Sequence, residues 1–400
     1  MTEPSRRRPW SVGLRTSPEG HRVTTFELFF DLVYVFAFTQ VSHLVAETHS
    51  GRGMVQALTV LGMLWWTWTS YSWLANQSPA DQGLLRFGMG IAMAAVFVAT
   101  LAIPEAYEDL PGGLFGPLVL VVAYVVVRVV HGALYVVAAA GDTALRRQLV
   151  RTAVVAIAPS TALLFVGAVV GEPQQTWIWL AAFTFDVLLT LVTGRRGSWR
   201  LYSPTHWAER YGLIVILALG ESVVAIGVGA SHLPVSWPVI TGAALSIAIA
   251  LLLWWIYFVT SAGAAEHRLA HLEGVARAEY ATLAYTYLHY VLIAAVVVVA
   301  VGIEEAMAHV GSDEPFGRFA AWALAAGLAA YLLGATVLVR SARRPWIWRR
   351  VVEAALLVAL VPVLASLPAL GALALAAGVV YAFAIGAQVR GSRARSADDT

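Results

Sequence analysis

The chain has 400 residues, of which 59% are hydrophobic and 12% are charged, and its formal net charge is +2. A soluble protein carries roughly 25% charged residues, so this composition excludes an ordinary soluble enzyme, a disordered chain and a nucleic-acid binder. A helix needs about 20 mostly apolar residues to cross a bilayer. The apolar content is therefore enough for about a dozen such helices.

Apolar runs between polar breaks predict the membrane-spanning helices in chain order. The first six are predicted at 26–46, 54–75, 84–103, 114–139, 149–170 and 176–193. The second six are predicted at 207–230, 237–261, 280–303, 317–339, 351–367 and 370–388. The predicted fold class is all-α, a polytopic integral membrane protein with about twelve transmembrane helices.

Arginine placement predicts the orientation of these helices. Positively charged residues are retained in cytoplasmic loops. Here all 26 basic residues are arginine, and most of them lie in alternate loops, beginning with the first tail, while the opposite loops hold only Arg52 and Arg318. Both termini are then cytoplasmic, as a basic tail over 1–25 and a second tail over 390–400. The first 25 residues lack the pattern of a cleaved signal peptide. With no cysteine, disulfides and cysteine-ligated metals are excluded, and we expect neither a metal nor a cofactor.

The second half of the sequence repeats features of the first. Leu64-Trp65-Trp66 recurs as Leu253-Trp254-Trp255, and both predicted third spans end in similar Ile-containing segments. We predict a first six-helix repeat over 26–193, a cytoplasmic linker over 194–206 and a second six-helix repeat over 207–389. An even number of spans makes the two repeats parallel. The alternative is chance similarity among helices rich in Ala, Val and Leu.

A few ionisable residues lie well inside the predicted spans, where they are costly and therefore functional candidates. The acids are Asp31, Asp186 and Glu221, and the one base is Arg128. Three negative charges and one positive charge leave a net charge of −2, so some acids must be protonated, hydrated or next to a cation. Arg128 needs a carboxylate partner, with Asp31 and Glu221 as the leading candidates and Asp186 next. Structural ion pairing is the alternative explanation of these charges.

The first and fourth spans carry polar residues at helical spacing. Glu27, Asp31 and Tyr34 share one face of the first span, and Gln40 and His43 lie on roughly the opposite face. In the fourth span, one arc carries Tyr124, Arg128, His131 and Tyr135, which resembles a proton relay or an anion clamp. Packed helices with satisfied polar groups are the alternative for both spans.

Aromatic residues and one histidine complete the set of candidates. Trp65 and Trp66 lie near the middle of the second span and could form an aromatic wall around a substrate, although core packing explains them as well. His289 is a further candidate with the same alternative. The predicted ion-pathway residues are Asp31, Glu221, Arg128, Asp186, Glu27 and His131; the substrate-cavity candidates are Tyr34, Gln40, His43, Trp65, Trp66, Tyr124, Tyr135 and His289.

Two long segments resemble the bacterial low temperature requirement A family. They are the segment from Glu27 to His43, ELFFDLVYVFAFTQVSH, and the segment from Glu209 to Ser222, ERYGLIVILALGES. The resemblance extends over about 26–390 and implies a multi-pass protein of the bacterial cytoplasmic (inner) membrane, in a family named for growth in the cold. It implies no substrate or reaction.

The opening of the first span is also similar in pattern to the first helix of lysosomal-type potassium and proton channels. Phe30 stands where that family has serine, and Leu32 where it has glycine. The leading functional hypothesis is a proton- or cation-coupled secondary transporter; an ion channel and a membrane scaffold or stress-adaptation protein are the alternatives. An enzyme is not expected, because motifs such as His-Glu-x-x-His and Gly-x-Ser-x-Gly are missing from the sequence. The expected partners are the lipid bilayer and a small-molecule or ion substrate, and no oligomeric state is indicated.

Overall fold

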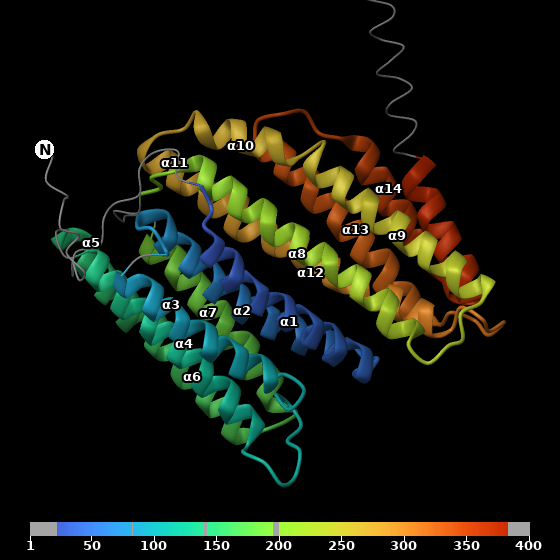
Figure 1. Cartoon of the computed structure of the whole chain (residues 1–400), viewed down its shortest axis with the longest axis horizontal. Coiled ribbons are helices and arrows are strands. Elements are labelled where there is room, and N and C mark those ends of the chain that lie inside the picture. The colour runs from blue at the N-terminus through green and yellow to red at the C-terminus, as the bar shows by residue number, and fades with distance from the viewer. Residues whose placement is uncertain (1–21, 82, 140–141, 195–199, 383–400) are drawn as a thin grey trace, which may run out of the picture. The chain divides into compact units, whose positions relative to one another are not determined.

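The computed structural model describes residues 22–81, 83–139, 142–194 and 200–382. Within these residues the secondary structure is helical and no β-strand forms, which confirms the predicted all-α class. The predicted tail over 390–400 and most of the tail over 1–25 lie outside the described residues, as does part of the predicted linker over 194–206. Figure 1 shows the order of the helices.

The described chain divides into two compact units. Unit 1 comprises Met1–Ala37, Gly62–Arg210 and Glu273–Glu279, and unit 2 comprises Phe38–Leu61, Tyr211–Leu272 and Tyr280–Thr400. Three long helices are divided between the two units: α1 (Thr25–Thr48), α2 (Gly51–Gln77) and α8 (Pro204–Ala230); of the short helix α11 only the last residue lies in unit 2. Neither unit is a continuous half of the chain, and the predicted pair of six-helix repeats stays a prediction.

Unit 1 contains all the helices between residues 83 and 194. They are α3 (Gly83–Leu101), α4 (Gly116–Ala138), α5 (Thr143–Thr152), the π-helical segment η1 (Ala153–Ile157), α6 (Ala158–Val170) and α7 (Gln174–Gly194). Helix α3 packs along α4, and α6 packs along α7. Asp142 caps α5 by accepting hydrogen bonds from the backbone nitrogens of Ala144 and Leu145. Helix α11 (Gly274–Tyr280) lies almost wholly in this unit.

Unit 2 contains the remaining helices. They are α9 (Trp237–Phe258), α10 (Ala262–Ala270), the π-helical segment η2 (Ala281–Tyr287), α12 (Leu288–Ala308), α13 (Arg318–Ser341), α14 (Trp348–Ala359), α15 (Val361–Ser366) and a short apolar helix, Ala369–Ala382. Helices α12 and α13 pack closely because glycines face the partner backbone. A Cβ atom at Gly302 would lie 2.7 Å from the backbone nitrogen of Leu324, so a larger residue would push the two helices apart.

Nine helical segments in the described residues are long and apolar enough to cross a bilayer: Thr25–Thr48, Gly83–Leu101, Gly116–Ala138, Thr143–Val170, Gln174–Val192, Pro204–Ala230, Trp237–Ala270, Gly274–Ala308 and Arg318–Ser341. The three other predicted spans coincide with α2, with α14 and α15 together, and with the helix Ala369–Ala382. Helix α2 is long, but it carries many polar residues. The count of twelve and the cytoplasmic termini therefore stay predictions.

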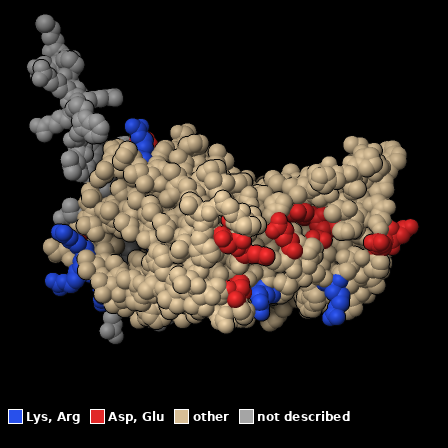
Figure 2. All heavy atoms as spheres, turned by 90° about the horizontal axis from the view of Figure 1, so that it is seen from below, with Lys and Arg blue, Asp and Glu red and all other residues tan. Residues whose placement is uncertain are grey.

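Large apolar side chains are exposed along these helices. Phe87 is 68% exposed, and Val169 and Leu188 are also exposed. Figure 2 shows one face of the molecule, on which most of the surface carries neither basic nor acidic side chains. Exposure of so large an apolar surface to water is unfavourable, whereas contact between this surface and lipid tails is not. The helices are therefore suited to a bilayer.

Candidate functional site

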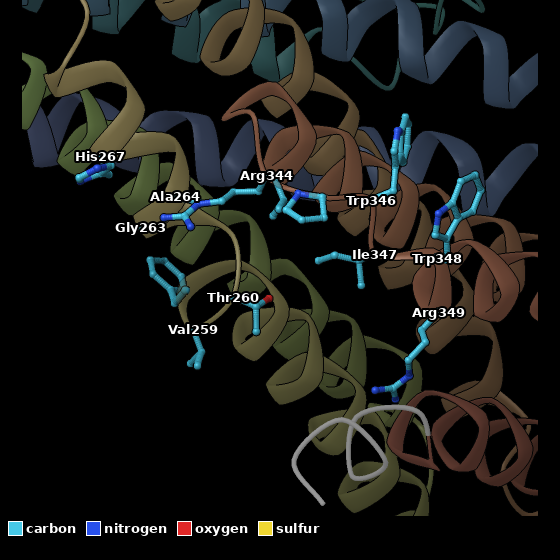
Figure 3. Close-up of a pocket in the computed structure, with 13 residues that line it drawn as sticks. Val259, Thr260, Gly263, Ala264, His267, Arg344, Trp346, Ile347, Trp348 and Arg349 are labelled. Carbon is cyan, nitrogen blue, oxygen red and sulfur yellow. The ribbon is translucent and has the colours of Figure 1, made fainter. Parts of the chain in front are cut away.

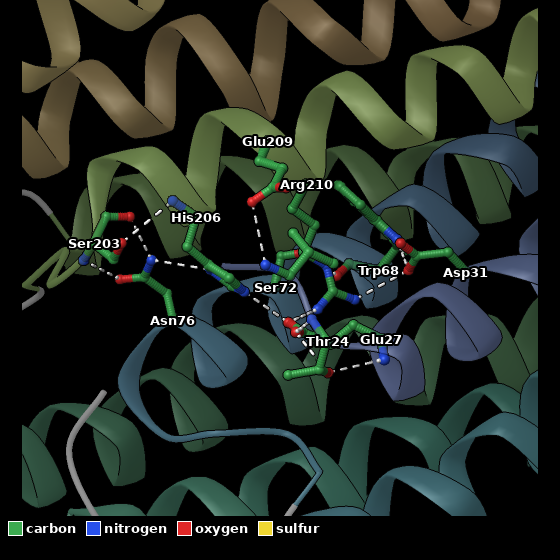
Figure 4. A network of polar contacts seen from close by, with 11 residues as sticks. Thr24, Glu27, Asp31, Trp68, Ser72, Asn76, Ser203, His206, Glu209 and Arg210 are labelled. Atoms are coloured by element: carbon green, nitrogen blue, oxygen red, sulfur yellow. Dashed lines mark hydrogen bonds and ion pairs between the residues drawn. The ribbon is translucent and has the colours of Figure 1, made fainter. Parts of the chain in front are cut away.

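A buried polar network in unit 1 joins α1, α2 and α8 (Figure 4). Arg210 on α8 donates from one terminal nitrogen to Oε1 of Glu27 at 2.5 Å and from the other to Oδ1 of Asp31 at 3.0 Å. Trp68 on α2 donates its indole N–H to the same Oδ1 atom at 2.7 Å. All four side chains are fully buried. Glu27 and Asp31 lie one helical turn apart on α1, so a single guanidinium can contact both.

Glu27 is also part of the N-terminal cap of α1. Its Oε2 atom accepts hydrogen bonds from the backbone nitrogen and the hydroxyl of Thr24, at 2.8 and 2.9 Å. The Glu27 backbone nitrogen donates to the Thr24 hydroxyl at 3.3 Å. Threonine followed three residues later by glutamate is the capping-box pattern. Both carboxylate oxygens of Glu27 are therefore engaged, and this residue anchors the start of α1.

Asn76 faces His206, the fourth residue that contacts the carboxylates. Its Oδ1 atom accepts from the backbone nitrogens of Tyr202 and Ser203, and its amide nitrogen donates to the Ser203 carbonyl at 2.8 Å. The amide nitrogen also faces Nδ1 of His206 at 3.3 Å. Because that nitrogen can only donate, we assign Nδ1 as the acceptor. Nε2 of His206 then donates to Oε1 of Glu27 at 2.8 Å.

The charges of Glu27, Asp31 and Arg210 do not balance. With His206 neutral, Glu27 and Asp31 carry two negative charges against the single positive charge of Arg210, so the sum is −1. Oδ2 of Asp31 and Nε of Arg210 are buried without a hydrogen-bond partner in the described residues. A proton or a small cation at Oδ2 of Asp31 would bring the sum to zero. The network can therefore hold one positive charge beyond those of its own side chains.

The second ion pair of unit 1 joins α4 and α7. A terminal nitrogen of Arg128 lies 3.0 Å from Oδ2 of Asp186, and both side chains are buried. The Thr190 hydroxyl donates to the same carboxylate at 3.3 Å. The prediction that ranked Asp31 and Glu221 ahead of Asp186 as the partner of Arg128 was wrong, because Arg128 pairs with Asp186 and Arg210 pairs with Asp31.

The other unit 1 candidates are engaged in the packed interior. Nε2 of His131 lies 3.0 Å from the Ser70 carbonyl, and the ring packs against those of Tyr71 and Tyr135. The hydroxyl of Tyr34 is hydrogen-bonded to that of Thr67 at 3.0 Å, and the Gln77 amide donates to the Tyr135 hydroxyl. The guanidinium of Arg128 lies over the ring of Tyr124, and the rings of Trp65 and Trp68 are stacked. Trp66 is buried, at 7% exposed. Their positions fit core packing, the alternative that the sequence left open.

Unit 2 contains a buried carboxylate of a different kind. Glu221 on α8 is 1% exposed and accepts hydrogen bonds from the hydroxyls of Thr39 at 2.7 Å and Ser42 at 2.5 Å, both on α1. Glu27, Asp31 and Asp186 each pair with an arginine. Glu221 has no ion pair with a basic side chain among the described residues. Two hydroxyl donors are its hydrogen-bond partners.

A series of titratable side chains lies near Glu221 in unit 2. Glu221 interacts electrostatically with half-buried His43, and Glu304 on α12 interacts with His43, Glu221 and Glu305. Glu305 contacts exposed His49 at 2.7 Å. Helices α8 and α12 approach closely here, because a Cβ atom at Gly229 would lie 2.4 Å from the Glu304 carbonyl oxygen.

His289 and Gln40 are the remaining candidates, both in unit 2. Nδ1 of His289 lies 2.8 Å from the Ala284 carbonyl, and Nε2 lies 2.7 Å from the Tyr257 hydroxyl. A carbonyl only accepts, so Nδ1 carries the proton and Nε2 accepts from tyrosine. His289 is thus a satisfied core residue next to the π-helical segment. Gln40 is half-buried on α1.

Sequence reasoning missed Arg210, His206, Asn76 and Trp68. A signal for two of them was present, since His206 and Arg210 have the same four-residue spacing as Glu27 and Asp31, and matched spacing can align two pairs of polar side chains along adjacent helix faces. Asn76 and Trp68 gave no such signal. The described residues contain no group of three or more His, Asp or Glu residues that could hold a metal ion.

Fold and site together define a multi-pass helical membrane protein with ionised side chains buried between its helices. The chain belongs to the family of the bacterial low temperature requirement A protein (LtrA), whose family model matches residues 22–385. This confirms the resemblance seen in the sequence. The chain is also 28% identical over 298 residues to "Uncharacterized protein RA0937" of Rhizobium meliloti (strain 1021), which covers 71% of this chain and 69% of that protein. No solved structure matches the chain.

Proposed function

We propose that this protein is a secondary transporter driven by a proton or a small cation, and that Glu221 binds the driving ion. The observation that carries the proposal is the surroundings of Glu221. A buried carboxylate without a cationic partner is strongly disfavoured as a bare charge. Such a group takes up a proton or binds a cation, and the two hydroxyls of Thr39 and Ser42 supply further oxygen atoms beside it.

The series from His49 to Glu221 supports a path for that ion. Each member is titratable, and the series passes from an exposed histidine through half-buried Glu305, Glu304 and His43 to the buried acid. Proton relays in membrane proteins are built from Asp, Glu and His in such chains. Asp31 is a second acid with a free oxygen in unit 1, which gives the transporter a second place for a positive charge.

The test measures ion binding without requiring a known substrate. Proteoliposomes adsorbed on a solid-supported membrane are exposed to jumps in pH, Na⁺ or K⁺. We expect the natural sequence to give a transient current for at least one of these ions, because ion entry to a buried site moves charge. Glu221→Gln should abolish the transient, and Glu47→Gln, which changes an exposed acid on α1, should retain it.

The alternative functions, an ion channel and a scaffold, would each give a different current recording. A sustained current that unitary recordings in planar bilayers resolve into single openings would show an ion channel and overturn the transporter. No charge movement with any of the three ions would favour a scaffold. An undiminished transient in a folded Glu221→Gln variant would remove Glu221 from the mechanism.

A further inference from the structure

A cavity of about 870 Å³ lies in unit 2, away from the residues considered above (Figure 3). One wall is formed by the segment that ends α9 and begins α10, including Thr260 and His267. The other wall is formed by the connection from α13 to α14, including Arg344, Trp346, Trp348 and Arg349. In the view of Figure 3, Thr260 and Ile347 lie between the two arginines.

The charge of this cavity favours an anion. Arg344, Arg349 and His267 line it, and none of its lining residues, which all belong to the described part of the chain, is Asp or Glu. Arg344 is exposed and forms no ion pair within the described residues. Arginine side chains bind phosphate oxygens through paired N–H groups.

The N-terminus of α14 adds to this preference. Ile347 precedes the helix, and no side chain caps it. The first N–H groups of a helix lack partners within the helix and carry a partial positive charge. Ile347, Trp348 and Arg349 all line the cavity, so this helix end adjoins the same space as the two arginines.

Contacts from a neighbouring buried arginine hold the two walls together. Arg350, which is 8% exposed, donates to the hydroxyl of Ser261 at 3.3 Å and to that of Thr260. These bonds fasten the first turn of α14 to the segment after α9. The cavity is therefore formed by fixed elements.

The position of the cavity indicates a lipid as the source of the anion. It lies where the apolar sequences of α9 and α13 end, at Phe258 and Ser341. Trp346 is 44% exposed and Trp348 is 67% exposed, and tryptophan prefers the boundary between lipid and water. A lipid would place its phosphate at the arginines and its acyl chains against the exposed apolar side chains, whereas free phosphate would leave those side chains uncovered.

We propose that this cavity binds the phosphodiester headgroup of an anionic phospholipid. The probe is phosphatidylglycerol, titrated into the purified full chain in detergent and followed by native mass spectrometry, with phosphatidylcholine as the neutral comparison. Phosphatidylglycerol should bind more tightly than phosphatidylcholine. Arg344→Gln/Arg349→Gln should lower the affinity for phosphatidylglycerol roughly thirtyfold, because each arginine near an anionic headgroup contributes about 1 kcal/mol of binding free energy.

The matched control is Arg340→Gln/Arg343→Gln, which removes two charges from exposed positions nearby that do not line the cavity. It should leave the affinity within a few-fold of the natural sequence. Arg344→Gln alone serves if the double variant fails to fold, because Arg344 lies outside the helices. Equal loss in both double variants, or equal binding of the two lipids, would overturn the site. Displacement of phosphatidylglycerol by millimolar inorganic phosphate would instead identify free phosphate as the ligand and overturn the lipid assignment.

Discussion

The indole nitrogen of Trp68 donates a 2.7 Å hydrogen bond to Oδ1 of Asp31, and the other oxygen of this buried carboxylate has no hydrogen-bond partner in the described residues. The orientation of Asp31 therefore depends on Trp68 as well as on Arg210. The indole also lies over the guanidinium, with Cζ of Arg210 at 5.5 Å from the ring centroid. One tryptophan thus contacts both members of the ion pair.

Trp68→Phe is expected to keep an aromatic ring in place and remove the donor. A hydrogen bond to a charged group contributes about 1.5 to 3 kcal/mol, so the free energy of unfolding should fall by about that amount. A denaturant titration followed by circular dichroism measures the loss. Trp177→Phe, at an exposed tryptophan of the same unit, should change stability little; a similar loss in both variants would show that Trp68 contributes only its ring.

The pair of Arg128 and Asp186 is expected to serve structure rather than transport. Asp186→Asn leaves the arginine buried without a counter-charge, which costs about 3 to 5 kcal/mol. Arg128→Gln/Asp186→Asn removes both charges, so it should be more stable than either single variant and should keep the transient current. A folded double variant without the current would place this pair in the ion pathway.

The series beside Glu221 is expected to control how fast the ion reaches it. His43→Gln or Glu304→Gln should slow the rise of the transient current by up to roughly a hundredfold, within the range of losses seen when a proton-transfer group is removed. The total charge moved should not change, because Glu221 remains. Time-resolved currents after a pH jump measure both quantities. Unaltered kinetics in both variants would show that the ion takes another route.

Asn76 is expected to hold the start of α8. Asn76→Ala removes the acceptor for the backbone nitrogens of Tyr202 and Ser203 and leaves these groups without that partner, at about 1 to 3 kcal/mol each when buried. Hydrogen–deuterium exchange over 200–206 should speed up, while exchange in α13 should stay constant. Unchanged exchange at both places would mean that other contacts suffice at the start of α8.

The helices were predictable from sequence because hydropathy is a local property. Each of the twelve predicted apolar segments coincides with helix in the described residues. The ion pairs were not predictable in the same way. A carboxylate inside a span indicates that a partner is needed, but the sequence does not identify the residue that provides it. Arg210 was overlooked because the span was predicted to begin at 207, which placed this arginine at its edge. Helix α8 begins at Pro204, and Arg210 is fully buried.

The special surroundings of Glu221 also lay beyond sequence reasoning. Its depth in the span was evident, but the two hydroxyls that contact it belong to α1, and Ser42 is 179 positions away in the sequence. Serine and threonine are common in apolar helices, where they bond to their own backbone. A single sequence does not distinguish serine and threonine hydroxyls that bond to their own backbone from hydroxyls that also contact a carboxylate on another helix.

The pairing of Asp31 with Arg210 has a consequence for biosynthesis. The two residues are 179 positions apart, and ribosomes add about 5 to 20 residues per second, so the aspartate is made roughly 10 to 35 s before its arginine. If α1 is inserted during synthesis, Glu27 and Asp31 enter the membrane before Arg210, the cation that pairs with both of them, has been made. The completed α1 therefore needs a temporary aqueous or protein environment, and unit 1 reaches its final packing only after α8 has been inserted.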